Sequence, residues 1–177
     1  SYNGAKRRTY EKAREMAKRG LQVRKWAYVS MFVKPDKHPN ADILSKMPRA
    51  IQYRQPAFNM LVGCYLKPFE LNYYEYEGML GLHVLAKGKN NVQRAENIVT
   101  ASSHFRNPLY LLLDHSKFDS YVRIDHLKWI HSVYNKSYRD GFLRWLLSFQ
   151  LVNRGFTKSG LRYRINGTRM SGDYDTG

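Results

Sequence analysis

Two aspartates that follow an apolar run are the residues best placed to do chemistry. Asp114 and Asp119 lie five positions apart, and residues 110–113 before them read Tyr-Leu-Leu-Leu. A continuous apolar run of this kind is typical of a buried strand, which would hold Asp114 at a rigid place. A carboxylate there can bind Mg²⁺, which prefers oxygen ligands and phosphate partners. Taken alone, the spacing is weak evidence, because helix capping or solvation accounts for either aspartate more simply.

A second candidate group stands near residue 171. Ser171 and Gly172 offer a hydroxyl and a flexible backbone beside the amides of an expected helix N-terminus. Such a place can contact phosphate or sugar hydroxyls. The simpler alternative is an ordinary helix cap, in which Asp173 complements the helix dipole.

A third group is cationic. Lysines and arginines around a triphosphate neutralise the charge that develops during phosphoryl transfer. The residues of this group are Lys34, Lys37, Lys46, Arg49 and Arg54. For any one of them, a solvated loop position is an equally good explanation.

These groups need helices and strands to position them, and the sequence predicts both. Helical composition and spacing predict helices over residues 10–19 with Thr9 as N-cap, 58–77 with Pro68 inside, 92–103, from about 120 onward with Ser120 or Asp119 as cap, and 142–152. Apolar and β-branched segments predict strands over residues 27–33, 48–56 and 110–113. Asn166-Gly167 is a strong hairpin signal between residues 161–165 and 168–170.

The net charge points to a polyanionic partner. The 177 residues include 30 Lys and Arg against 14 Asp and Glu, which gives +16, while 43% hydrophobic and 14% aromatic content exclude a disordered basic tail. The cations are spread over many segments, which favours a nucleic-acid backbone over one membrane-facing amphipathic helix. No apolar stretch approaches the ~20 residues that span a bilayer, so no transmembrane segment is expected in this chain.

The order of these groups resembles the RNA-directed RNA polymerases of positive-strand RNA viruses, most closely the tombusvirus-like group. Three of that family's motifs occur in the family's order, and a fourth segment resembles the one that precedes them. The matching segments are residues 2–10 before motif F, 32–37, 48–56 and 63–70 in motif F, 113–119 and 126–134 in motif A, and 167–177 in motif B.

The chain departs from the family pattern at two places. Asp175 stands where the family usually has Asn, which would add negative charge near the sugar site. Motif C, a Gly-Asp-Asp hairpin, does not occur, and the only Gly-Asp is Gly172-Asp173 within motif B. We therefore expect these 177 residues to be inactive alone, with an incomplete catalytic site.

The resemblance implies an α+β right-hand polymerase fold with a central antiparallel sheet and packed helices, incomplete without motif C and the thumb. Residues 1–177 would form one partial polymerase domain. Residues 1–108 would be mostly fingers, including motif F, and residues 109–177 would hold palm motif A and the fingers/palm motif B.

The resemblance also assigns roles to single residues. Asp114 would be the catalytic residue that binds Mg²⁺, or Mn²⁺ in its place. The nucleotide-binding residues would be Lys34, Lys46, Arg49 and Arg54 at the triphosphate and Asp119, Ser171, Gly172 and Thr176 at the sugar. Asp119 would accept a hydrogen bond from the ribose 2′-hydroxyl, which disfavours a reverse transcriptase, because that class places a bulky aromatic residue there.

The function implied is template-directed transfer of ribonucleotides to an RNA 3′-hydroxyl, with release of pyrophosphate, for viral genome replication. Its partners would be an RNA template and product strand, ribonucleoside triphosphates and other viral replication proteins. Its location would be the host cytoplasm, in membrane-associated replication complexes. The alternative is a basic, non-catalytic RNA-binding protein, which would need neither Asp114 nor Asp119. A membrane-surface protein is disfavoured, because no single amphipathic stripe occurs.

Overall fold

The computed structural model describes residues 3–37, 39, 45, 47–78 and 80–176, which fall into two compact units. The first unit comprises Ser1–Tyr65 and Lys117–Gly177, and the second comprises Leu66–Ser116. Helices and strands both occur in the first unit, so the α+β class is confirmed.

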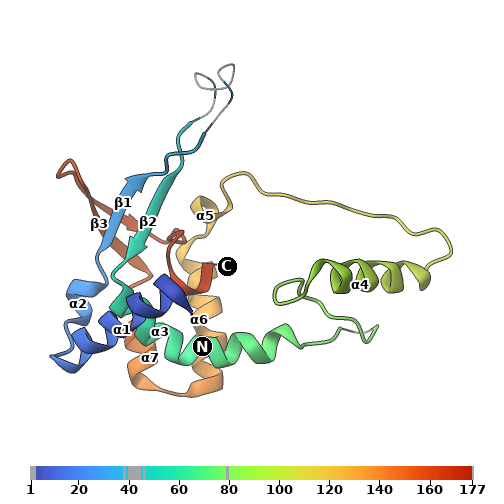
Figure 1. The fold of residues 1–177 in the computed structure, drawn as a ribbon, viewed down its shortest axis with the longest axis horizontal. Coiled ribbons are helices and arrows are strands. Elements are labelled where there is room, and N and C mark those ends of the chain that lie inside the picture. The colour runs from blue at the N-terminus through green and yellow to red at the C-terminus, as the bar shows by residue number, and fades with distance from the viewer. Residues whose placement is uncertain (1–2, 38, 40–44, 46, 79, 177) are drawn as a thin grey trace. The chain divides into compact units, whose positions relative to one another are not determined.

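A four-stranded sheet organises the first unit (Figure 1). Its strands are β1 (Val29–Val33), β2 (Ala50–Arg54), β3 (Val152–Thr157) and β4 (Arg162–Asn166), in the spatial order β2-β1-β3-β4. Strand β1 runs antiparallel to β2 and parallel to β3, and β3 runs antiparallel to β4. The sheet is therefore mixed, where a purely antiparallel one was expected.

The strand register gives this sheet two chemically different faces. Val29 lies opposite Arg54 on one side and Gly155 on the other, and these positions are buried. We call their side the inner face. Because side chains alternate along a strand, Arg154 and Phe156 point to the opposite, outer face, and both are exposed.

Helices gather at one end of the sheet and supply most of the apolar core (Figure 1). They are α1 (Gly4–Lys18), α2 (Val23–Trp26), α3 (Pro56–Tyr74), α6 (Ile124–Tyr138) and α7 (Gly141–Ser148). Phe58 of α3 is fully buried and meets Phe149 edge-on, with ring centroids 6.3 Å apart. Leu143, Leu146 and Leu147 bury one face of α7.

The junction between α6 and α7 is built by one aspartate and two tyrosines. Asp140 caps α7 by accepting hydrogen bonds from the amides of Phe142 and Leu143, at 2.7 and 2.9 Å. The Tyr65 hydroxyl donates to the same carboxylate at 3.3 Å, and the Tyr138 hydroxyl donates to the carbonyl of Tyr65. These bonds fix the start of α7 against α3 and α6.

The second unit lacks the buried strand expected at residues 110–113. Helix α4 (Asn91–Ser103) begins with a capping box in which Asn90 and Gln93 each accept the other's amide, at 2.9 Å. The segment that follows is extended but has no strand partner among the described residues, so its side chains stay exposed: Leu109 is 93% exposed and Leu112 is 90% exposed. The strand prediction is wrong for this structure, because a strand needs a neighbour to pair with.

Some of the other predicted elements are confirmed by the structure and some are not. The helices near residues 58–77 and 92–103 and the first two strands are confirmed with small shifts, and α3 continues through Pro68. Thr9 is not a cap, since α1 begins at Gly4 and the Thr9 hydroxyl donates to the carbonyl of Ala5 within the helix. The hairpin joins β3 to β4 across residues 158–161, so the turn expected at Asn166-Gly167 is misplaced.

Candidate active site

Ser171 and Gly172 lie along the edge of β2 and extend its hydrogen bonding. The Ser171 hydroxyl accepts a hydrogen bond from the Gln52 amide at 3.0 Å, and the Gly172 amide donates to the Gln52 carbonyl at 2.7 Å. A Cβ atom on Gly172 would lie only 2.5 Å from the Tyr53 Cβ, so a residue with a side chain does not fit. The motif B glycine is thus needed for close contact with the motif F strand.

The segment that contains Asp119 is hydrogen-bonded to the residues just before Ser171. Asp119 lies half-buried in the short helix α5 (Phe118–Tyr121) and does not cap α6, which begins five residues later. The Asp119 carbonyl accepts from the Arg169 amide at 3.0 Å, and the Val122 carbonyl accepts from the Thr168 amide at 2.6 Å. The structure therefore brings together the segments of Asp119, of Ser171 and of β2, which lie far apart in the sequence.

A buried ion pair joins β2 to the segment of Ser171. The Arg54 Nε lies 2.7 Å from Asp173 Oδ1, and both side chains are almost fully buried. The Arg54 guanidinium also donates to the Ala27 carbonyl and to the side-chain oxygen of Asn153, and it lies 5.2 Å from the centroid of the Phe58 ring. One side chain thus contacts the residue that follows α2, together with β3, α3 and motif B.

Further polar side chains complete this buried network. The Gln150 amide nitrogen donates to Asp173 at 3.3 Å and to Asp175 at 3.2 Å, and Arg169 forms an ion pair with Asp175. Burial raises the pKa of Asp173, and the charge and hydrogen bonds of Arg54 oppose that rise. The extra negative charge of Asp175 is balanced by Arg169, so it is not free to act on a sugar site.

The network changes the interpretation of two residues. Arg54 was expected to contact a triphosphate, but its guanidinium is buried and bonded to protein groups. Asp173 was expected to complement a helix dipole, yet it pairs with Arg54 over a separation of 119 residues. Sequence reasoning missed Gln150 and Asn153 entirely, since neither lies in a recognisable pattern.

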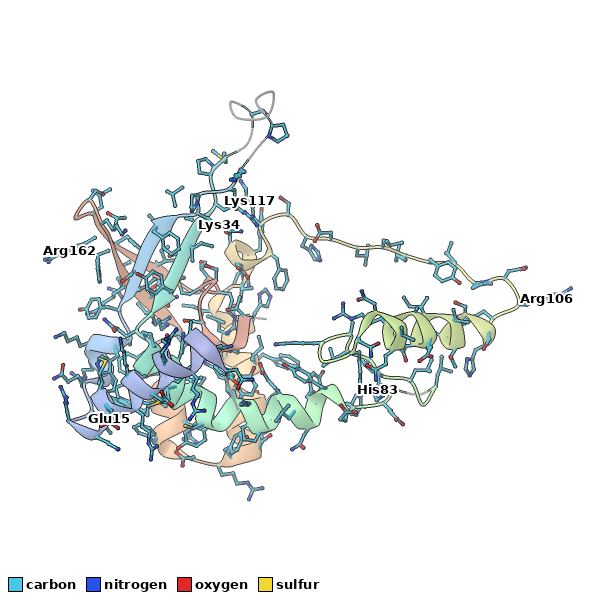
Figure 2. All side chains as sticks on the ribbon, viewed as in Figure 1. Glu15, Lys34, His83, Arg106, Lys117 and Arg162 are labelled. Carbon is cyan, nitrogen blue, oxygen red and sulfur yellow. The ribbon has the colours of Figure 1, made fainter. Side chains whose placement is uncertain are left out.

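Lys34 and Arg49 meet at the end of β1 and β2, where Lys34 is labelled in Figure 2. The Lys34 amide donates to the Arg49 carbonyl at 2.8 Å. Between the two side chains lies Asp36, 3.0 Å from Lys34 Nζ and 2.8 Å from Arg49 Nε. Hydrogen bonds from Arg49 and then from Lys34 lower the pKa of Asp36 to about 2. Sequence reasoning had missed this carboxylate, which holds two cations of motif F side by side.

The remaining predicted residues are less tightly held. Thr176 lies in the 3-10 helix η2 (Tyr174–Thr176), and its hydroxyl donates to the Met170 carbonyl at 2.7 Å. Lys46 lies outside the described residues. Asp114 belongs to the second unit, where it is exposed on the extended segment.

Asp114 offers the donor chemistry that a hard divalent cation requires. The described residues contain no group of three or more metal-binding side chains. Its exposed carboxylate fits Mg²⁺ or Mn²⁺ in ligand type, and a complete site would need further oxygen ligands.

Comparison with known proteins decides the family. The family model described as "Viral RNA dependent RNA polymerase" matches residues 1–177. The chain belongs to this family of viral RNA-dependent RNA polymerases.

Individual members of the polymerase family are similar across the same residues. The chain is 39% identical to the RNA-directed RNA polymerase of Pothos latent virus (isolate Pigeonpea/India), 37% to that of Melon necrotic spot virus and 34% to that of Turnip crinkle virus. Each match covers 99% of this chain and 23–24% of the relative. The chain therefore spans about a quarter of the length of the curated relatives it matches, and the tombusvirus-like resemblance is confirmed.

The buried ion pair leads to a prediction about stability. Replacing Arg54 by Met should lower the free energy of unfolding by about 3–5 kcal/mol, because Asp173 is left buried and unpaired. Urea unfolding of the complete polymerase measures this loss. Arg7→Met, which breaks the exposed pair with Glu11, is the control and should change little. Equal losses in the two variants would contradict the central role of Arg54.

His131 leads to a prediction about pH. Burial lowers the pKa of His131, whose Nε2 lies 3.0 Å from Gln150 Oε1. Because the unfolded chain takes up the proton more readily, stability should fall as the pH drops below about 6.5 toward the folded-state pKa. The melting temperature should therefore fall less between pH 7.5 and 5.5 in His131→Gln than in the unsubstituted protein. His126→Gln, which removes an exposed histidine of the same helix, should retain the full pH effect.

Proposed function

We propose that this chain is part of an RNA-directed RNA polymerase, which transfers ribonucleotides to an RNA 3′-hydroxyl under the direction of a template and releases pyrophosphate. In the cell this reaction would replicate a viral RNA genome. The observation that carries the proposal is that the motif F strand, the Asp119 segment and motif B meet through hydrogen bonds in one unit. The family membership of the whole chain supports the same activity.

The proposal extends to the fold. Residues 1–108 would be mostly fingers and residues 109–177 would hold the palm motif A and motif B of a right-hand polymerase. The mixed sheet with packed helices is compatible with a partial polymerase domain. The chain spans about a quarter of the length of its relatives. The rest of the right-hand polymerase fold is therefore proposed on the basis of family membership.

Asp114 would be the catalytic carboxylate that holds Mg²⁺ or Mn²⁺. When bound, the metal would stabilise the charge that develops on the reacting phosphate oxygens. The part played by this chain's own residue is to present carboxylate oxygens at the end of an extended segment.

Lys34, Arg49 and Lys46 would hold the incoming triphosphate. Asp36 keeps the first two together, and their side chains remain 43% and 68% exposed, so both can still contact a phosphate. Arg54 would act differently: it positions β2 against motif B and does not contact the nucleotide.

Asp119, Ser171, Gly172 and Thr176 would form the sugar site. The half-buried Asp119 carboxylate can accept the 2′-hydroxyl of a ribose. Ser171 keeps acceptor capacity beside its bonds to Gln52, while Gly172 lets the motif B backbone approach β2. These residues would select ribonucleotides over deoxyribonucleotides.

Partners and location follow as proposals. The polymerase would bind an RNA template, the product strand and ribonucleoside triphosphates, and it would work with other viral replication proteins in membrane-associated complexes of the host cytoplasm. In the part of the chain that the structure describes, no helix is long and apolar enough to cross a bilayer.

Substitution of Asp114 tests catalysis against simple RNA binding. In the complete polymerase, Asp114→Asn should reduce template-directed incorporation of labelled ribonucleotides by on the order of 100-fold or more, because a charge-stabilising group is lost. Binding of RNA should be unchanged. Asp125→Asn, which removes another exposed carboxylate, is the control. Full activity of Asp114→Asn would remove Asp114 from the catalytic site. RNA binding without any incorporation by the unsubstituted polymerase would favour the alternative, a basic RNA-binding protein without catalysis.

Substitution of Asp119 tests the sugar site. Asp119→Ala should lower the rate and reduce discrimination against deoxyribonucleotides, because the ribose hydroxyl loses a partner that contributes about 1–3 kcal/mol. The measurement compares kcat/KM for a ribonucleotide with that for its deoxy analogue in the complete enzyme. Discrimination as strong as in the unsubstituted enzyme would remove Asp119 from the sugar site.

A further inference from the structure

The outer face of the sheet carries a cavity that none of the predicted site residues lines. Its volume is about 890 Å³, and it lies against α2, β1, β3 and β4. Side chains around it include Lys25, Tyr28, Arg154, Phe156, Arg162 and Arg164. We call this surface the outer groove.

The strand register concentrates positive charge in the outer groove. Arg154 lies directly opposite Arg164 in the β3–β4 pair, and Arg162 lies opposite Phe156. Like charges at directly opposite positions destabilise a sheet. A bound anion between the arginines would turn this repulsion into attraction. Figure 2 shows Arg162 projecting outward from the hairpin.

Carboxylates are missing from this surface, in contrast to the inner face. The described residues that line the cavity include no Asp or Glu. Within the described part of the chain, none of the ion pairs involves Arg154, Arg162 or Arg164. By contrast, Arg54 on the inner face and Arg169 in motif B each pair with an aspartate. The outer arginines therefore have their charge available for a ligand.

Exposed aromatic rings accompany the cations. Phe156 and Tyr28 line the groove, and each is 45% exposed. A second cavity of about 360 Å³ shares Tyr28, Arg154 and Arg164 with the first, so the basic surface continues beyond one pocket. A cationic track with aromatic rings beside it is the pattern that binds single-stranded nucleic acid by phosphate contacts and base stacking.

We propose that the outer groove binds a single-stranded segment of RNA, with its phosphates on Arg154, Arg162 and Arg164 and its bases against Phe156 and Tyr28. The choice of RNA over DNA rests on the proposed function. Stacking requires unpaired base faces, so a duplex would use the arginines alone. A membrane is disfavoured, because this surface is a sheet rich in arginine and not an amphipathic helix.

Salt dependence of binding tests the arginines. The complete polymerase is titrated with a fluorescent oligouridylate of twelve nucleotides, without nucleotide substrate or divalent metal, at several salt concentrations. Each phosphate contact contributes about 0.7 to the slope of log K against log salt for a single strand. Arg154→Gln with Arg164→Gln should flatten the slope by about 1.4. Arg8→Gln with Arg14→Gln, which removes two exposed arginines of α1, is the matched control and should leave the slope as it is.

Phe156 tests the stacking contact separately. Phe156→Ala should weaken binding of the oligouridylate about fivefold or more without changing the salt slope. Crosslinking with 4-thiouridine in the same RNA should modify Phe156 or Tyr28 in the unsubstituted protein, as located by mass spectrometry. This second measurement uses the unsubstituted protein, so it does not depend on whether a variant folds.

Three results would overturn the proposal. The first is a salt slope of the Arg154→Gln, Arg164→Gln variant equal to that of the α1 control. The second is a set of crosslinks that avoids the residues of the outer groove. The third is a loss of binding to phosphatidylserine vesicles in the arginine variant while its RNA binding persists. The last result would assign the surface to a membrane. None of these measurements requires nucleotide incorporation, so failure of the catalytic proposal at Asp114 remains distinguishable from failure of the groove.

Discussion

The buried pair of Arg54 and Asp173 is the constraint on which the arrangement of the first unit depends. A guanidinium removed from water is stable only if its donors find partners, and here these come from Asp173, the Ala27 carbonyl and Asn153. Those partners lie on motif B, beside α2 and on β3. Displacing any one segment would leave a buried charge or a polar group unsatisfied, so the motif F strand and motif B are held in a single register.

The cations of the first unit fall into two classes, according to whether a buried carboxylate neutralises them. Arginines on the inner face of the sheet and in motif B neutralise buried aspartates and stabilise the fold. Arginines on the outer face have no such partners among the described residues, and Lys34 and Arg49 share one carboxylate between them. The net charge of +16 does not show this difference between paired and available cations. A cation that is paired inside the protein attracts no polyanion.

Sequence reasoning reached the family and most elements, and it named segments that meet in the structure, but it did not reach the side-chain pairing between those segments. Motif order and apolar spacing are local properties, so β2 and α4 were predicted close to their observed bounds. The role of Arg54 depends on Asp173, 119 residues away, and no local pattern distinguishes a buried arginine from an exposed one. The strand expected at residues 110–113 was wrong for the same reason, since pairing is a property of two segments.

The exposed run before Asp114 bears directly on the proposed metal site. Four leucines at 109 and 111–113 are each at least 77% exposed, a state that the hydrophobic effect disfavours in water. Metal binding needs oxygen atoms held within narrow distances, a constraint that strand pairing next to Asp114 would supply. Pairing of residues 110–113 with another strand would bury the leucines and fix Asp114 in one step. Metal binding at Asp114 is therefore expected to depend on that strand pairing as much as on the carboxylate itself.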